Sequence, residues 1–189
     1  MDVNLATVNE THMKGNDKLK IEGFKTFSRN RQDAAMGGVC TIVKNDKAGE
    51  VLKVSEGKDD EYIITRHGEY EPALNIINYY GKQESRQVKD NIDKDWENLL
   101  DEIIKIESKG ENVIIASDMN RHVGKFIPGN HDKNMYAGKL LIGFLNKGDY
   151  ILLNSSPLEI NGPFTRYETN DSNNADKVSS KFCLLFQNL

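Results

Sequence analysis

Residues 112–124, with the sequence NVIIASDMNRHVG, decide the fold. The first half is a run of apolar, mostly β-branched residues that is typical of a buried strand. The run ends abruptly at Asp118 and Asn120. Such a strand delivers a carboxylate and a carboxamide to the loop at its carboxyl end, and side-chain alternation predicts that the two point the same way. An acid that binds a metal or orients a water, beside an amide that donates to a phosphate oxygen, suits metal-assisted attack on a phosphate ester.

The elements around this strand are predicted from apolar spacing and from turn residues. One helix is predicted from apolar residues three and four apart between Ile92 and Ile106, with Gly110 as its C-cap, and a second over 136–147. Residues 11–33 are polar and are expected to form a loop. Strands are predicted at residues 3–8, 39–43, 51–54, 61–65, 74–80, 112–116, 150–153 and 164–167. Strands first and strand-helix-strand units later predict an α/β (α+β) fold in which helices cover sheets.

Composition limits the class of protein. The chain has 189 residues, which suits one domain, and a net charge of −4, which counts modestly against nucleic-acid binding. Two distant cysteines, Cys40 and Cys183, give neither a disulfide framework nor a zinc ribbon, so a reducing compartment is favoured. No signal peptide and no apolar stretch of about 18 residues is evident. We therefore expect an intracellular monomer, nuclear or cytoplasmic rather than secreted, with no membrane partner.

Two further side chains stand at strand ends beside this acid and amide. Glu10 follows the strand 3–8, and together with Asp118 it would suit Mg²⁺ or Mn²⁺, which prefer oxygen ligands. Tyr80 ends the strand 74–80, and its phenol could donate to a phosphate oxygen. Each has a plainer alternative: Glu10 as a turn or cap residue, and Tyr80 as an aromatic that packs against a sheet edge.

The stretch 11–33 carries six basic and three acidic residues inside an acidic chain. It could contact a phosphate backbone beside Glu10, although a solvated loop explains it equally well. The candidate nucleic-acid contacts are Lys14, Arg29, Arg31 and Arg121.

Five stretches carry a family resemblance, in unbroken order from about residue 3 to residue 167. They are Asn9-Glu10-Thr11-His12, Gly37-Gly38-Val39, Asn78-Tyr79-Tyr80-Gly81, Ser117-Asp118-Met119-Asn120, and residues 138–144 followed by Leu152-Leu153-Asn154. Together they resemble the endonuclease/exonuclease/phosphatase superfamily. The likeness is greatest to apurinic/apyrimidinic endonuclease-like domains of non-LTR retrotransposons and to craniofacial development protein 2-like sequences. The resemblance implies a two-sheet, DNase I-like sandwich with outer helices and a site at one edge between the sheets.

The resemblance also implies roles for the candidate residues. Glu10 matches the metal-binding glutamate, Asp118 the aspartate that orients or deprotonates the attacking water, Asn120 the asparagine that holds the scissile phosphate, and Tyr80 the phosphate-contacting tyrosine. Lys82 stands where a proline is usual, and Ser117 where a glycine is usual.

The ends of the chain depart further from the family. The family opens with a strand bearing a metal-contacting asparagine and closes with an aspartate strand and an Asp-His pair, and none of these is matched. Leu185 stands where the strand's aspartate is expected. We therefore expect an incomplete domain over residues 1–167, followed by a polar segment over residues 168–189 that is disordered or decayed.

The sequence thus predicts a Mg²⁺-dependent DNA endonuclease of the retrotransposon nicking type, weak or inactive as this chain. Two alternatives remain: a phosphatase of the same superfamily that acts on small phosphoesters, and a non-catalytic remnant or binding module.

Overall fold

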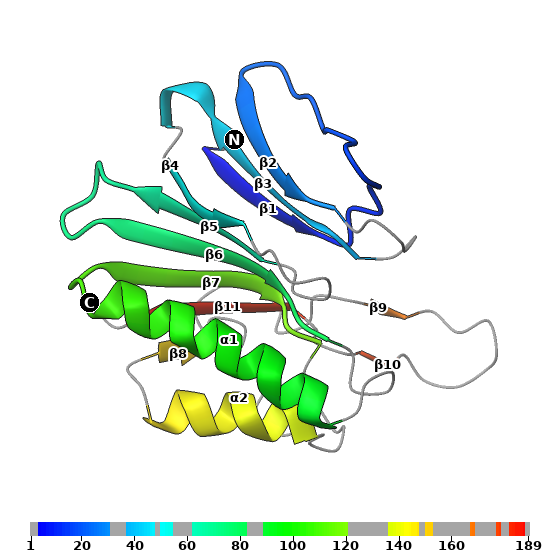
Figure 1. The fold of residues 1–189 in the computed structure, drawn as a ribbon, viewed down its shortest axis with the longest axis vertical. Helices are drawn as coiled ribbons and strands as arrows, with labels where there is room; N and C mark the ends of the chain where they lie inside the picture. Colours follow the sequence, from blue (N-terminus) through cyan, green and yellow to red (C-terminus); the bar gives the residue numbers. More distant parts are fainter. Residues whose placement is uncertain are drawn as a thin grey trace.

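Two β-sheets pack face to face, and two helices cover the outer face of the larger sheet (Figure 1). The computed structural model describes residues 4–30, 37–47, 50–54, 62–82, 89–120, 136–147, 150–152, 167–168, 177–178 and 182–187. The small sheet has the antiparallel order β1-β3-β2, formed by β1 (Leu5–Asn9), β3 (Val39–Lys44) and β2 (Phe24–Arg29). A short 3₁₀ turn, Asn45–Lys47, follows β3.

The large sheet is mixed. Its spatial order is β4 (Glu50–Val54), β5 (Tyr62–His67), β6 (Leu74–Tyr80), β7 (Asn112–Asp118), β11 (Phe182–Gln187) and β8 (Tyr150–Leu152). The pair β6–β7 is parallel and the other pairs are antiparallel. Parallel neighbours need a crossover connection, which α1 (Lys89–Glu107) provides. Two short strands, β9 (Tyr167–Glu168) and β10 (Lys177–Val178), pair with each other.

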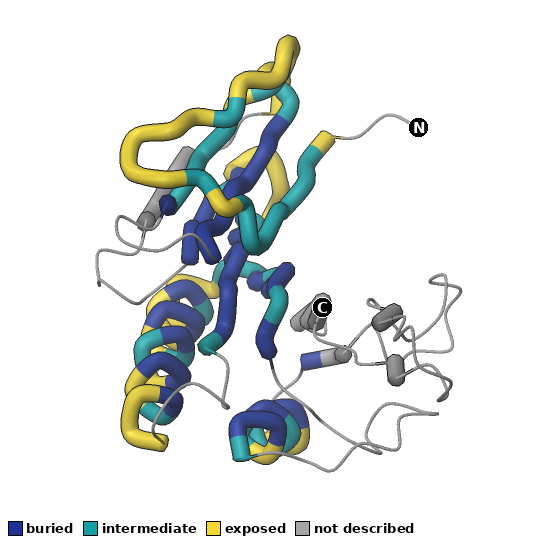
Figure 2. Tube along the Cα trace, turned by 90° about the vertical axis from the view of Figure 1, so that its right-hand side faces the viewer, coloured by how far each residue is buried: buried dark blue, intermediate teal, exposed yellow. Residues whose placement is uncertain are grey.

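Helix α1 packs one apolar stripe on the sheet. Ile92, Trp96, Leu99 and Ile103 are buried at intervals of three and four residues, so they lie on one face of the helix. In Figure 2 this inner face is dark blue and the outer face is mostly yellow. Gly110 ends the segment with a φ of 70°, a left-handed conformation that glycine adopts at little cost.

The two faces of the large sheet have different partners. Tyr62, Ile77, Tyr79 and Ile115 face the helices in the main core. The opposite face packs on the small sheet, where Tyr80 clusters with Val39, Ile63 and Phe27. Tyr79 and Tyr80 therefore serve different layers, as expected from side-chain alternation. The strand ends at Tyr80 and Asp118 lie at one end of this interface between the sheets.

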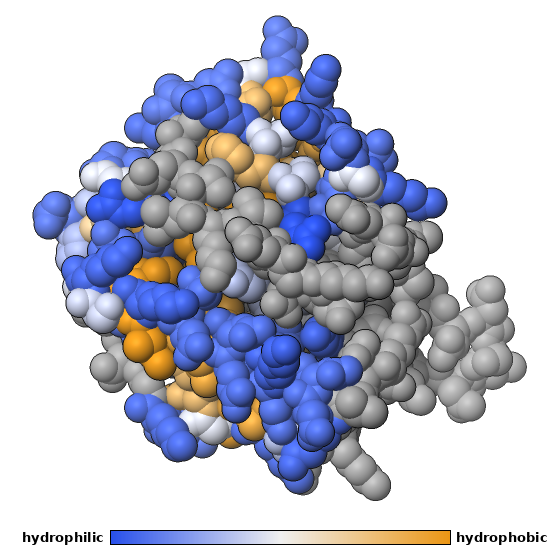
Figure 3. Space-filling model, viewed as in Figure 1, coloured by the Kyte–Doolittle hydropathy of each residue, from blue (hydrophilic) through white to orange (hydrophobic). Residues whose placement is uncertain are grey.

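Helix α2 (Tyr136–Lys147) completes the helical layer. Phe144 joins the two helices and β8, with its ring centroid 5.7 Å from that of Trp96 and 4.7 Å from that of Tyr150. A groove of about 580 Å³ between α1 and α2 includes Leu100 and the exposed Ile104. Figure 3 shows apolar side chains on this helical face. The groove shares no residue with the candidate site described below.

The structure confirms the two-sheet α/β sandwich and the two helices expected from the sequence. The loop predicted over residues 11–33 is wrong in part, because Phe24–Arg29 forms β2 along β3. The division at residue 167 stays a prediction; β11, near the end of the chain, pairs with β7 and β8. Within the described residues, no helix combines the length and the apolar character that a membrane crossing requires.

Candidate active site

Tyr80 and Asp118 are the last residues of neighbouring parallel strands. They are register partners in the β6–β7 pair, so their side chains leave the same end of the sheet on the same face. The backbone N–H of Gly81 donates to the carbonyl of Asp118 at 2.8 Å, which keeps the two strand ends in contact beyond the last rung. The sheet itself therefore brings the phenol and the carboxylate together.

Glu10 reaches the same place from the small sheet. It follows β1 directly and has a φ of 55°, a left-handed conformation that a non-glycine residue adopts at a cost of roughly 1 kcal/mol or more. Two backbone hydrogen bonds beyond it hold the turn: Thr11 N–H donates to the carbonyl of Gly38 at 3.2 Å, and His12 N–H to that of Gly37 at 3.0 Å. The turned backbone directs the Glu10 carboxylate toward β6.

The Tyr80 hydroxyl donates to Glu10 Oε1 at 2.5 Å. Burial raises the pKa of Tyr80 well above its usual value of 10, and the Glu10 carboxylate raises it further, whereas the Asn120 amide opposes the shift. Asp118 adds to the shift through its charge. Tyr80 is therefore a neutral phenol at neutral pH, and it acts as a hydrogen-bond donor rather than as a base.

Asn120 is placed by a turn, which corrects the alternation argument. Strand β7 ends at Asp118, and Asn120 lies beyond it with a φ of 48°, so strand alternation does not relate the two side chains. Instead, the backbone N–H of Asn120 donates to Asp118 Oδ1 at 3.0 Å, and its Nδ2 donates to the carbonyl of Gly81 at 2.8 Å. These bonds hold the Asp118 carboxylate and the Asn120 amide beside Tyr80.

The structure thus brings Glu10, Tyr80, Asp118 and Asn120 together; the chemical roles that the resemblance implies for them stay predictions. The donor set fits Mg²⁺ or Mn²⁺, because Mg²⁺ is commonly held by one or two carboxylates plus waters and substrate phosphates. Within the part of the chain that the structure describes, no group of three or more His, Cys, Asp or Glu side chains could form an all-protein cage. Leu185 pairs with Ile115, so it lies three residues before Asp118 along the sheet.

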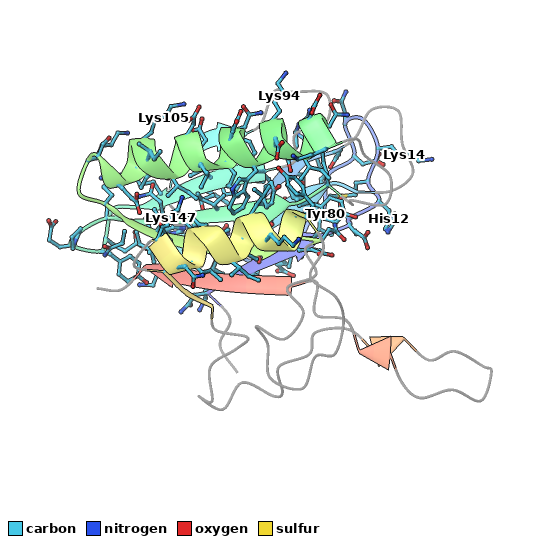
Figure 4. The ribbon with its side chains drawn as sticks, turned by 90° about the horizontal axis from the view of Figure 1, so that it is seen from below. His12, Lys14, Tyr80, Lys94, Lys105 and Lys147 are labelled. Carbon is cyan, nitrogen blue, oxygen red and sulfur yellow. The ribbon has the colours of Figure 1, made fainter. Side chains whose placement is uncertain are left out.

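The candidate nucleic-acid contacts are only partly placed. Lys14 is exposed on the loop after β1, and Figure 4 shows it at the same end of the molecule as Tyr80 and His12. Arg29 ends β2, is partly buried, and donates to the carbonyl of Asn30 at 3.0 Å. Arg31 and Arg121 lie outside the described residues.

Three residues of the site environment were not singled out from the sequence. Asn9 and Asn78 carry side-chain hydrogen bonds between the two sheets, and Gly81 lies against the backbone of Met119. A signal for Asn78 is its place as the polar residue on the face that it shares with Leu74, Ile76 and Tyr80 in the strand 74–80. All three residues lie inside the quoted motifs, which assign them no role.

Three solved structures show the fold to which this arrangement belongs. The endonuclease domain of TRAS1, a telomere-specific non-LTR retrotransposon, matches with a TM-score of 0.61 and 15% identity, over 97% of this chain and 73% of that chain. The Xenopus laevis APE2 catalytic domain matches with a TM-score of 0.71 and 14% identity, over 98% and 74%. An AP endonuclease from Archaeoglobus fulgidus matches with a TM-score of 0.65 and 14% identity, over 97% and 76%.

No protein-family model matches the sequence, and the search of curated proteins gave no match. At the identities above, the structural likeness establishes the fold. The resemblance to the endonuclease/exonuclease/phosphatase superfamily is therefore confirmed at the level of the fold, across nearly the whole chain.

Proposed function

We propose that this chain, which has the fold of the endonuclease/exonuclease/phosphatase superfamily, is a metal-dependent phosphodiesterase that nicks DNA. The observation that carries the proposal is the meeting of Glu10, Tyr80 and Asp118 at one end of the sandwich, from three strands and two sheets. A bound Mg²⁺ or Mn²⁺ would neutralise charge on the scissile phosphate. Glu10 and Asp118 are the residues proposed to hold it.

The chain's own groups then divide the work. Asp118, whose carboxylate is fixed by the Asn120 N–H, would orient and deprotonate the attacking water. The Asn120 amide and the Tyr80 hydroxyl would donate to phosphate oxygens. In the structure the hydroxyl of Tyr80 donates its single proton in a hydrogen bond to Glu10, so it can donate to a phosphate oxygen only when that hydrogen bond breaks.

Access for the substrate is proposed at this same end. Lys14 is exposed there and would contact the phosphate backbone, with Arg29, Arg31 and Arg121 as further proposed contacts. The TRAS1 match, to an endonuclease domain of a retrotransposon, supports nicking of the retrotransposon type for this chain. We also propose a monomer with slow turnover that acts inside the cell, in the nucleus or cytoplasm.

Nicking of supercoiled plasmid with Mg²⁺ tests the proposal. Asp118→Asn should lower the rate by about 10²-fold or more, because it removes the group that takes the proton from water. Asp101→Asn, the same change on the exposed face of α1, is the matched control and should leave the rate unchanged. Wild-type nicking by Asp118→Asn would refute the assignment.

A phosphatase of the same fold is the second candidate, and a binding module is the third. Inositol phosphates assayed beside plasmid separate a phosphatase from a nuclease. A formed cation site predicts that Mg²⁺ raises the melting temperature by mass action, and that Glu10→Gln abolishes the shift. A module without a cation site predicts no shift in either protein.

A further inference from the structure

A buried amide lies in the interface between the two sheets. Asn78 is fully buried in β6, on the face that packs against the small sheet. Its Nδ2 donates to the carbonyl of Cys40 at 2.9 Å and lies 3.3 Å from Thr41 Oγ1, both on β3. Its Oδ1 accepts a hydrogen bond from Asn9 of β1 at 3.1 Å. One side chain of the large sheet is thus tied to two strands of the small sheet.

Asn9 adds a second tie at the same place. Its Nδ2 also donates to the backbone carbonyl of Tyr79, at 3.0 Å. Asn9 directly precedes Glu10, and Tyr79 directly precedes Tyr80. The bond between Tyr80 and Glu10 is therefore one residue further along both strands than the bond from Asn9 to Tyr79.

Consecutive residues of an extended strand point to opposite faces, so Asn9 and Glu10 could not both reach β6 from a regular strand. The left-handed backbone of Glu10, with a φ of 55°, removes this restriction. Backbone strain of this kind persists only where surrounding interactions hold it. The Asn9 bonds on one side and the Thr11 and His12 backbone bonds on the other supply those interactions.

Asn9 and Asn78 lie next to apolar side chains, so the reason for polar amides at these two positions needs an explanation. Beside these amides the interface holds an apolar cluster, in which Val39, Ile63 and Phe27 surround Tyr80. Apolar side chains of similar size could fill the same volume without desolvating amides, so the buried amide of Asn78 and the partly buried amide of Asn9 add little net stability. Hydrogen bonds are directional and apolar contacts are not, so the amides define how β1 lies along β6. A slip of one residue, about 3.3 Å, would separate Glu10 from Tyr80.

We propose that the Asn9–Asn78 amide pair is a positioning device that fixes β1 against β6, so that the Glu10 carboxylate meets the Tyr80 hydroxyl. Asn9 and Asn78 are positioning residues, since they act through Glu10 and Tyr80. The structural part of this inference is independent of catalysis, whereas its effect on nicking rests on the proposed function.

The test follows the Tyr80 hydroxyl proton by NMR, because a buried hydroxyl bonded to a carboxylate exchanges slowly with water. Tyr80→Phe assigns the signal. Asn9→Ala and Asn78→Ala should lose it, since each frees β1 from β6. The matched control is Asn75→Ala. Asn75 lies three residues before Asn78 in β6 and is also fully buried, but its Nδ2 donates to Glu111 at 2.9 Å and not to the small sheet. This variant should keep the signal despite a comparable loss of side-chain hydrogen bonds.

Retention of the hydroxyl signal in folded Asn9→Ala would overturn the proposal, as would its equal loss in Asn75→Ala. If Asn78→Ala does not fold, Asn9→Ala decides alone, because Asn9 is only partly buried. Nicking gives the separate functional result: Asn9→Ala should be at least tenfold slower than Asn75→Ala. A wild-type chain that shows the hydroxyl signal but nicks nothing would count against the proposed function and leave the positioning role supported.

Discussion

Gly81→Ala should uncouple the two strand ends that form the candidate site. Gly81 follows Tyr80, its N–H donates to the Asp118 carbonyl at 2.8 Å, and its carbonyl accepts from Asn120 Nδ2 at 2.8 Å. A Cβ at this position would lie 2.8 Å from the carbonyl carbon of Met119 and 3.2 Å from its Cα, with the carbonyl oxygen closer still. Backbone atoms cannot rotate away as a flexible side chain can, so the strand ends must move apart.

The magnitude follows from that displacement. Carbon atoms pack best about 3.5–4.0 Å apart, so the ends must open by roughly 1 Å. Overpacking of this kind costs about 1–3 kcal/mol, and the two hydrogen bonds of Gly81 weaken by up to about 1 kcal/mol each. We expect a loss of about 3 kcal/mol in the free energy of unfolding, or about 6–12 °C in melting temperature for a chain of this size. A displacement of about 1 Å would lower the nicking rate by about 10²-fold.

Urea unfolding and plasmid nicking measure the two effects. Gly143→Ala is the matched control, because a Cβ at Gly143 in α2 meets no atom within 4 Å. It should stabilise the chain by about 0.5–1 kcal/mol, since alanine is the better helix former. If Gly81→Ala unfolds within about 0.5 kcal/mol of the wild type, the close approach of β6 and β7 at this point is not real.

Three further predictions address single groups. Asn120 has a φ of 48°, which glycine adopts more easily than alanine. Asn120→Gly should therefore keep the fold but lower the nicking rate, whereas Asn120→Ala should also lower the free energy of unfolding in urea by about 1 kcal/mol. Equal stability of the two variants would contradict this. Tyr80→Phe should slow nicking by about 10²-fold through loss of one phosphate donor, and wild-type nicking by the variant would remove Tyr80 from the site. The hydrogen bond from Asn75, with help from Arg66, lowers the pKa of Glu111 below 4.5, so the stability that ionised Glu111 contributes is present above about pH 4.5 and is lost as the pH falls through the lowered pKa. Glu111→Gln should therefore make the melting temperature depend less on pH in the acid range. An unchanged acid range would show that the bond between Asn75 and Glu111 is unimportant for stability.

The sequence predicts best the helices and strands whose apolar residues recur with the spacing of the face that they bury. The apolar stripe of α1 and the uninterrupted apolar run of β7 each pack against the main core, so the spacing of their apolar residues is enough to predict the helix and the strand. Strand β2 was missed because its sequence, FKTFSR, mixes charged and polar residues with two phenylalanines. It is an edge strand of a small sheet and is only partly buried, so pairing with β3, rather than its own pattern, makes it a strand.

The candidate site shows where reasoning from periodicity stops. Asp118 and Asn120 were paired by strand alternation, yet alternation ends at Asp118, and a left-handed turn places Asn120. Glu10 is likewise placed by a left-handed residue at a strand end. Asparagine tolerates this conformation through local hydrogen bonds, but glutamate does so rarely, and no local pattern announces it.

The meeting of Glu10 and Tyr80 joins residues 70 positions apart across two sheets. Its geometry depends on how one sheet lies along the other, which neither sheet's own hydrogen-bond ladder determines. That information lies in the side chains that cross the interface, and Asn9 and Asn78 form hydrogen bonds among them. Since Asn9 is next to Glu10 and Asn78 is two residues before Tyr80, the same motifs that carry the candidate reactive groups also carry the bonds that align them.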